Sequence, residues 1–179
     1  TMGRSRFRFH ETHYPYFITC SVLDGIALFS DTELAKIVLN SLSYIQTEWS
    51  VTLYGYVIME NHCHLVLQSG KPSGHIRNFK SYTAKKIITS LQNRGRTLIL
   101  EKLRFHKKLH KHQSIHQVWQ EGVHAQQIDN DVKMSQVLEY IHFNPVKAGY
   151  VDDPVHWRYS SAGNYMGMDG LIPVSLFGE

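Results

Sequence analysis

The sequence predicts an α+β domain: a ferredoxin-like (RRM-like) antiparallel sheet with helices on one face, and an additional C-terminal helix that bears Tyr140. Three observations support this prediction. β-forming and amphipathic helical stretches follow one another in the order β-α-β-β-α-β, and a final helix comes after them. Two consecutive strands are separated by only two residues, which is typical of an antiparallel hairpin. A chain of 179 residues is long enough for one such domain with an extension.

The first half of the chain contains a strand, a helix and the hairpin. Residues 16–23 are rich in β-forming side chains and predict the first strand. Apolar side chains recur at helical spacing over residues 31–49, which predicts an amphipathic helix. Residues 51–59 and 62–68 are the two hairpin strands, with Glu60-Asn61 as the turn.

The second half begins with a long helix that we expect over residues 73–93. Residues 94–116 are expected to be irregular or to contain a short basic helix, and residues 115–128 to contain the fourth strand. Residues 131–144 predict a third helix, which Pro145 is expected to end because proline cannot donate a backbone hydrogen bond.

Composition excludes several classes of protein. Hydrophobic residues make up 42% and charged residues 19% of the chain, which excludes a disordered protein. No apolar run approaches the roughly 18 residues that span a bilayer, so we expect no transmembrane helix. Two cysteines provide no disulfide framework. We therefore expect one cytoplasmic domain over residues 1–179, with a core at about 14–150 and a C-terminal extension at 151–179.

Positive charge is concentrated in one segment. Residues 71–112 hold twelve of the nineteen Lys and Arg residues and one of the fifteen acids. Such a segment favours a polyanionic partner, because neutralising each phosphate releases counterions. The alternative is an ordinary solvated helix face. The candidate DNA-binding side chains are Arg77, Lys80, Lys85, Lys86, Arg94 and Arg96.

Two histidines open the second hairpin strand. Strand alternation puts His62 and His64 on one face and turns Cys63 toward the core. Two imidazoles at this spacing can bind one divalent metal ion. The alternative is a pair of solvent-facing histidines.

The third helix supplies two further candidates. Tyr140 and Asn144 are four residues apart and therefore share a helix face, at the rim of its buried stripe. Tyr140 can be a nucleophile or a boundary tyrosine with a solvated hydroxyl. Asn144 can be a metal ligand or the C-cap before Pro145.

Together these residues indicate one chemistry. A metal ion on His62 and His64, completed by the Asn144 amide oxygen, would polarise a scissile phosphate. Tyr140 would then attack phosphorus and form a covalent phosphotyrosine. Because a phenol has a pKa of about 10, it would need activation by the metal ion or by nearby cations.

The motifs around these residues resemble those of a known family. Residues 59–65 resemble the M-x-N-H-x-H-L signature of the IS200-like (Y1) transposases, and residues 140–149 resemble the Y-I-H-x-N-P-V-x-A-G signature of their REP-associated tyrosine transposase branch. Residues 118–122 and 157–162 match the aromatic-Trp-Gln and Trp-x-x-Ser-Ser elements of the family. The resemblance covers about residues 14–166.

This resemblance implies an HUH-type endonuclease and strand transferase that acts on single-stranded DNA, commonly beside a hairpin. It makes His62, His64 and Asn144 the ligands of Mg²⁺ or Mn²⁺, Tyr140 the nucleophile and Cys63 the residue of the hydrophobic slot. It also implies a 5′-phosphotyrosine intermediate and no external energy source. Members work as homodimers that share their active sites, or as monomers.

Two other functions compete with this one. A non-catalytic module that binds single-stranded nucleic acid would use the basic segment and exposed aromatic residues, but it would need neither the histidine pair nor Tyr140. A metal hydrolase that uses water would leave Tyr140 without a role. If the helix prediction is wrong, the fallback nucleophiles are Tyr54, Tyr56 and Tyr150.

Overall fold

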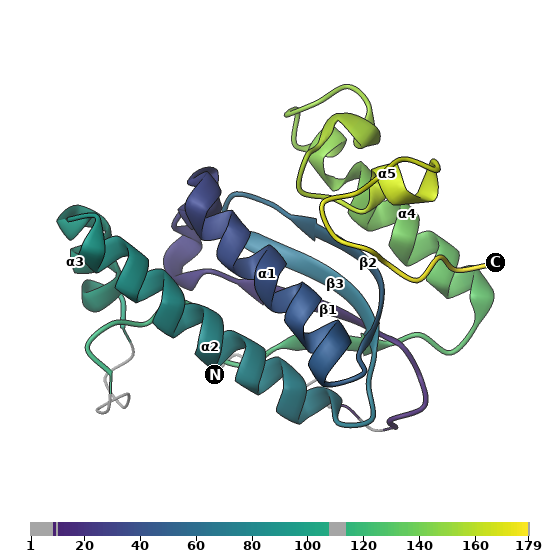
Figure 1. Cartoon of the computed structure of the whole chain (residues 1–179), viewed down its shortest axis with the longest axis horizontal. Helices are drawn as coiled ribbons and strands as arrows, with labels where there is room; N and C mark the ends of the chain where they lie inside the picture. The colour runs from purple at the N-terminus through teal and green to yellow at the C-terminus, as the bar shows by residue number, and fades with distance from the viewer. Residues whose placement is uncertain (1–8, 10, 108–113, 179) are drawn as a thin grey trace, which may run out of the picture.

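The computed structural model describes residues 9, 11–107 and 114–178, and within these residues four strands form one antiparallel sheet (Figure 1). The strand order is β2-β3-β1-β4, and every pair is antiparallel. The strands are β1 (Tyr16–Ser21), β2 (Thr52–Ile58), β3 (His62–Gln68) and β4 (His124–Gln127). The order confirms the ferredoxin-like prediction.

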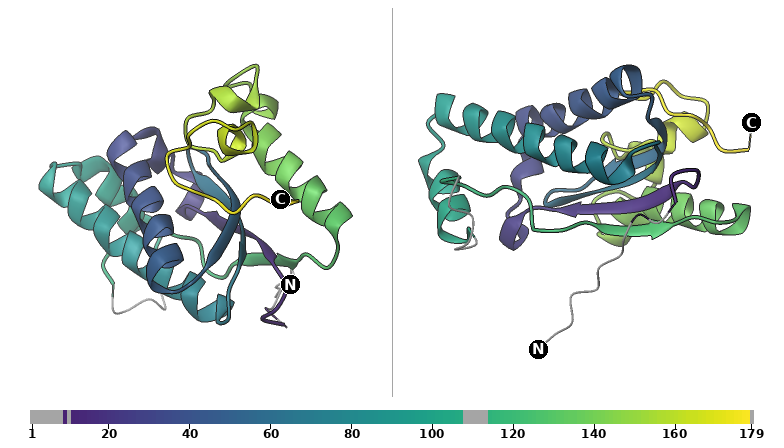
Figure 2. Two further views of the ribbon diagram at one scale, coloured as in Figure 1. Left: turned by 45° about the vertical axis from the view of Figure 1, so that its right-hand side comes forward. Right: turned by 90° about the horizontal axis from the view of Figure 1, so that it is seen from below.

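Helices cover both faces of this sheet (Figures 1 and 2). Helices α1 (Thr32–Glu48) and α2 (Pro72–Asn93) pack on one face, and α3 (Thr97–Phe105) follows at the end of α2. The additional C-terminal helix, α4 (Asp131–Lys147), packs on the opposite face against β2 and β3. The short helical segments are η1 (Leu23–Gly25), η2 (Leu28–Ser30), η3 (Pro154–His156) and α5 (Ala162–Tyr165).

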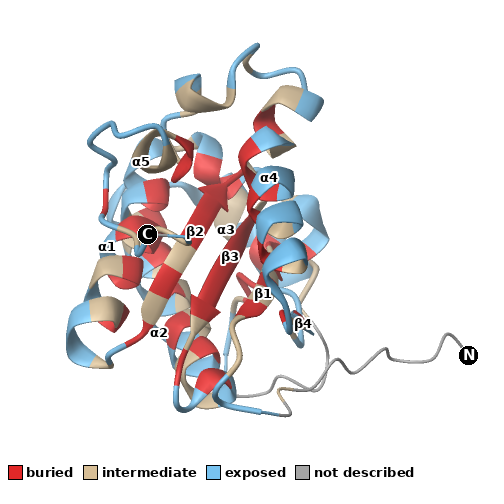
Figure 3. Cartoon of the chain, turned by 90° about the vertical axis from the view of Figure 1, so that its right-hand side faces the viewer, coloured by how far each residue is buried: buried red, intermediate tan, exposed pale blue. Residues whose placement is uncertain are grey.

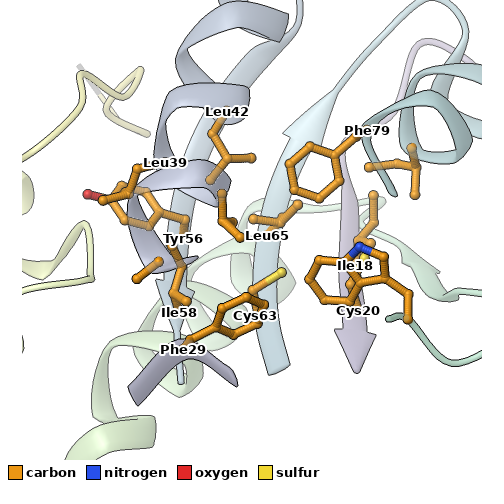
Figure 4. Packing of buried hydrophobic residues seen from close by; sticks show 14 of the residues in the cluster. Ile18, Cys20, Phe29, Leu39, Leu42, Tyr56, Ile58, Cys63, Leu65 and Phe79 are labelled. Carbon is orange, nitrogen blue, oxygen red and sulfur yellow. The ribbon is translucent and has the colours of Figure 1, made fainter. Parts of the chain in front are cut away.

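Strand alternation divides the buried side chains into two clusters. Cys20, Cys63 and Leu65 point toward α1 and α2 and belong to the larger cluster (Figure 4). Val57 and Val66 point the other way and pack with α4 in the smaller cluster. The two central hairpin strands β2 and β3 are therefore mostly buried, while α4 turns a long exposed side to solvent (Figure 3).

The stretch 115–128 contains the fourth strand, as expected, close to its end. Two other expectations need correction. The second helix begins at Pro72 rather than residue 73, because proline is favoured at the first helical position. Pro145 does not end the last helix, which continues to Lys147. A proline this close to a helix end removes a single backbone bond, and the Ala148 N–H still bonds to the Asn144 carbonyl at 3.0 Å.

Helix α4 approaches β2 closely at Gly55. A β-carbon at this position would lie 2.7 Å from Leu138 Cδ2, 3.1 Å from Ile141 Cδ1 and 3.3 Å from Ser161 Oγ. The pairing register of β2 and β3 also shifts between Leu53 and Gly55, as at a β-bulge. Glycine is therefore required here for space, since any side chain would push α4 away from the sheet.

The C-terminal residues fasten α4 to β2. Ser161 Oγ accepts a hydrogen bond from the Tyr56 N–H at 2.9 Å and contacts His142 Nε2 at 2.9 Å. Trp157, which precedes Ser161 in this segment, donates from Nε1 to the Ile58 carbonyl at 3.0 Å. The segment predicted as an extension is thus part of the structure that holds α4. No helix among the described residues has the length and apolar character needed to cross a membrane.

Gly55→Ala is expected to lower the free energy of unfolding by about 1–3 kcal/mol, because the added methyl group overpacks the contact with Leu138 and Ile141. Urea denaturation measures the change. Gly74→Ala is the matched control, since no atom lies within 4 Å of a β-carbon there and the residue is helical; it should be neutral or stabilising. Equal effects at the two positions would contradict the close approach.

Stability is also expected to depend on His142. Burial lowers the pKa of His142 to about 4, whereas a histidine in the unfolded chain titrates near 6.5. Between these values the unfolded state binds the additional proton, so stability falls as the pH falls from about 6.5 to 4. The loss of unfolding free energy that is linked to protonation of His142 is on the order of 3 kcal/mol.

His142→Gln should flatten this part of the stability curve, which urea denaturation at a series of pH values measures. The same change at His156, which is exposed, should leave the curve as in the wild type. A curve that remains as steep in the His142 variant would show that other groups cause the acid loss.

Candidate active site

The two histidines of β3 lie together at the start of the strand. The ring centroids of His62 and His64 are 4.8 Å apart, and both rings are on the α4 side of the sheet with Val66. His64 is 6% exposed and lies opposite Thr19 of β1. His62 is more accessible. The sequence prediction that the two imidazoles share a face is consistent with these positions.

A neighbouring side chain orients His62. Asn61 Nδ2 donates to the Gly25 carbonyl at 3.3 Å, so the Asn61 Oδ1 atom must face His62. Nδ1 of His62 lies 2.7 Å from this oxygen and therefore carries the ring proton. The Nε2 atom is left with a lone pair, which is the form of imidazole that binds a metal ion.

His64 is held in a similar way from the adjacent strand. Its Nδ1 atom lies 2.8 Å from Thr19 Oγ1, so Nε2 is the ring nitrogen that this contact does not use. Burial lowers the pKa of His64 to about 3, and the neighbouring His62 and His124 add to the effect. Burial also lowers the pKa of His62, although Glu60 opposes the shift. Both rings are therefore neutral near pH 7, as ligation requires.

Tyr140 of α4 reaches the same place. Its ring centroid is 5.6 Å from that of His64 and 5.8 Å from that of Phe17 of β1. Lys147, two helical turns later, places Nζ 5.4 Å from the centre of the tyrosine ring. Tyr140 is 41% exposed, so a phosphodiester can approach its hydroxyl. All of these residues belong to one chain.

Asn144 lies one turn after Tyr140 and is half-buried. It is inside the helix, whose C-cap is Ala148, so the alternative role of Asn144 as the C-cap is wrong. No cluster of three or more His, Cys, Asp or Glu side chains able to hold a metal ion occurs among the described residues. If the pair holds a metal ion, a third protein ligand among these residues would have to be of another type, such as an amide; two imidazoles with an amide oxygen would suit Mn²⁺ or Mg²⁺.

Cys63 faces away from the histidines. It lies directly opposite Cys20 in the larger cluster, and both residues are buried (Figure 4). A hydrogen bond with Cys20, together with burial, raises the pKa of Cys63 well above its usual range. The side chain is therefore a protonated core residue in the hydrophobic slot, and it contributes no soft thiolate ligand to the pair.

The fallback tyrosines are less well placed. Tyr56 is fully buried, and burial raises its pKa to about 12. Tyr54 donates its hydroxyl hydrogen to Gln68 Oε1 at 3.1 Å. Tyr150 stacks on Trp157 with ring centroids 5.4 Å apart. Among the described residues, Tyr140 is the tyrosine whose ring contacts the histidine pair, and it does so through His64.

The predicted DNA-binding residues lie apart from this site. Four of them are on α2, which lies in the helix layer on the opposite side of the sheet from α4 (Figure 2). Lys80 Nζ donates to the carbonyls of Gln120 and Gly122, and Arg94 pairs with Asp31. Exposed members of the group are Arg77, Lys85, Lys86 and Arg96. Residues 108–112 of the basic segment lie outside the described residues.

Comparison with known proteins agrees with this geometry. Residues 26–144 match the profile of the family described as "Transposase IS200 like". The chain belongs to the IS200-like transposase family. A Haemophilus influenzae Rd protein described as a candidate REP-associated tyrosine transposase is 31% identical over 104 residues, which are 58% of this chain and 54% of that protein. The chain thus matches about half the length of this curated relative.

A solved structure has the same fold as this family member. It is a REP-associated tyrosine transposase bound to a REP hairpin, and it superposes with a TM-score of 0.68 at 18% identity. The match covers 99% of this chain and 93% of that chain. At this level of identity the likeness establishes the fold alone.

Several residues of the site were not predicted from the sequence. Phe17 and Thr19 come from β1, and their proximity to His64 depends on the pairing register of β1 and β3. Lys147 could have been found, because it is seven residues after Tyr140 and shares its helix face. Asn61 was assigned only to the turn.

Asn61→Ala is expected to weaken Mn²⁺ binding by about 10-fold or more, because His62 loses the acceptor that fixes its proton on Nδ1. Isothermal titration calorimetry of the metal-free protein with Mn²⁺ measures the affinity. Asn93→Ala, at an exposed asparagine at the end of α2, is the matched control. An Asn61 variant that binds Mn²⁺ as tightly as the wild type would contradict the orienting role.

Proposed function

We propose that this family member is a metal-dependent endonuclease and strand transferase of single-stranded DNA that acts through a covalent 5′-phosphotyrosine. The observation that carries the proposal is the meeting of Tyr140 and His64, which come from α4 and β3, at a ring separation of 5.6 Å. A binding module has no need of a partly exposed phenol beside two oriented imidazoles.

Each side chain has a physical role in this proposal. His62 and His64 hold the divalent ion through Nε2, and Asn144 supplies an oxygen ligand. When bound, Mg²⁺ or Mn²⁺ polarises the scissile phosphate and neutralises part of its charge. Lys147 adds a positive charge beside the Tyr140 ring, which attracts the phosphate. Phe17 packs against both His64 and Tyr140 and fixes their separation.

The reaction is a transesterification that conserves phosphodiester bond energy. The Tyr140 oxygen, having lost its proton to solvent, forms a bond to phosphorus as the bond from phosphorus to the 3′ oxygen breaks. That oxygen takes up a proton and becomes a free 3′-OH, while the 5′ phosphate stays on Tyr140. Attack by another 3′-OH reverses these steps, joins the strands and releases the tyrosine.

The proposed substrate is single-stranded DNA that carries a hairpin. Support comes from family membership and from the structural relative, which is bound to a REP hairpin. The dense positive charge of residues 71–112 suits the phosphates of such a ligand. Because Tyr140 meets His64 within one chain, a single protomer holds the whole constellation, and a homodimer is not needed to complete it.

Tyr140→Phe is expected to abolish a covalent protein–DNA adduct, because the substitution removes the nucleophilic oxygen and keeps the ring that packs on Phe17 and His64. The assay is incubation with hairpin-containing single-stranded oligonucleotides and Mn²⁺ or Mg²⁺, followed by a denaturing gel. Hairpin affinity should stay within about twofold of the wild type. Tyr150→Phe is the matched control and should form the adduct normally.

The alternative functions give different results in the same assay. An adduct that persists in Tyr140→Phe would place the nucleophile elsewhere. Cleavage without any adduct would indicate hydrolysis by water. Binding with neither cleavage nor adduct, in the wild type with either metal ion, would support a non-catalytic nucleic-acid-binding module. His64→Ala should lose both cleavage and Mn²⁺ affinity.

A further inference from the structure

Helix α3 presents an apolar surface that the fold does not use. Its inner side is occupied, since Leu103 is buried and Ile99 and Leu100 pack against the larger cluster. On its outer side Leu98 is 74% exposed and Phe105 is 85% exposed. Together with Lys102 these residues recur at helical spacing on one face, and we call the three of them the α3 platform.

A pocket lies on this platform. It has a volume of about 330 Å³ and is lined by Leu98, Glu101, Lys102, Phe105 and His106. This volume is at the small end of the range for small-molecule sites, which is about 300–1,000 Å³. The pocket is shallow and open to solvent, and Phe105 is its largest apolar side chain.

Charge around the platform favours a polyanion. Residues 94–107 contain five Lys or Arg side chains and one Glu, and Arg96, Lys102 and Arg104 are exposed. A second copy of this chain is disfavoured as the occupant, because a symmetric interface would bring the same positive segments face to face. An exposed aromatic ring among cations is the arrangement that binds single strands by base stacking.

A chain of contacts shows that the α3 platform lies near the start of β3, where His62 and His64 are. His106 Nε2 pairs with Asp24 Oδ2 at 3.1 Å, and the adjacent Gly25 carbonyl accepts the hydrogen bond from Asn61, next to His62. Figures 1 and 2 nevertheless show α3 at the edge of the molecule, away from α4. A strand held at the active site could therefore reach α3 only with nucleotides remote from the scissile phosphate.

We infer that the α3 platform binds an unpaired nucleotide of the DNA strand that flanks the hairpin, by stacking its base on Phe105 while Lys102, on the same helix face, contacts its phosphate. The inference rests on the proposed function for the identity of the ligand. It adds a subsite that discriminates hairpins with single-stranded flanks from blunt hairpins. Because every base has a π-face, this subsite is tolerant of sequence.

The test compares two DNA ligands, a blunt hairpin and the same hairpin with a single-stranded flank on either side. Fluorescence anisotropy with the full chain measures both affinities. Phe105→Ala should bind the flanked hairpin roughly tenfold more weakly and the blunt hairpin unchanged. Phe105→Trp should retain the wild-type affinity. Tyr44→Ala is the matched control, since Tyr44 is an exposed aromatic residue on α1, outside the basic segment.

Two further measurements separate stacking from other causes. Phe105→Ala should keep the salt dependence of binding, whereas Lys102→Gln should reduce its slope by about one. A 2-aminopurine in the flank should be quenched by the wild type and not by Phe105→Ala. Because Phe105 is almost fully exposed, a folding defect does not explain a loss.

Other outcomes overturn the inference. Equal affinity of Phe105→Ala and the wild type for the flanked hairpin would show that no base stacks there. A dimer that Phe105→Ala dissociates, with DNA binding unchanged, would assign the platform to a second copy. If the wild type shows this discrimination but forms no covalent adduct, the platform stands and the proposed catalytic function fails.

Discussion

The close packing of α4 against β2 is the contact on which the site depends. The histidine pair sits on β3, where pairing with β1 and β2 fixes its position. Tyr140 sits on a helix that touches the sheet only through side chains, so its distance from His64 is set by how near α4 can come. Because Gly55 has no side chain, α4 can come this close to β2. The contact between Ser161 and His142 then keeps α4 in this position.

The two faces of the sheet have separate roles. The face covered by α1 and α2 contains the larger cluster, including the buried thiols of Cys20 and Cys63, and it stabilises the fold. The other face has a smaller cluster and carries the polar residues of the site. Alternation along β3 lets a single strand serve both, since Cys63 is buried in one layer while its two neighbours face the other.

Local patterns in the sequence were sufficient for most of the fold. Helix α1 and both hairpin strands were predicted within one residue at each end, because apolar periodicity and a short turn determine them locally. The end of α4 was predicted wrongly, since the rule for proline in a helix interior overstates its effect in the last turn. The four-residue β4 was located only within a longer stretch, because its pairing with β1 is a long-range contact.

The sequence identifies the candidate residues of the site but not the side chains that surround them. His62, His64, Tyr140 and Asn144 stand in motifs, and their spacing along one strand and one helix could be interpreted directly. Thr19 and Phe17 meet His64 only through strand pairing, and the role of Asn61 depends on a hydrogen bond to η1. Such partners depend on distances between elements, which spacing within one element does not contain.

The order of the elements along the chain has a consequence during synthesis. The histidine strand emerges before α4 and before the residues that fasten α4 to β2. A ribosome-bound or prematurely terminated chain can therefore fold much of its sheet without having the phenol beside the imidazoles. For a protein proposed to cut single-stranded DNA, such unfinished chains would lack the nucleophile beside the histidine pair.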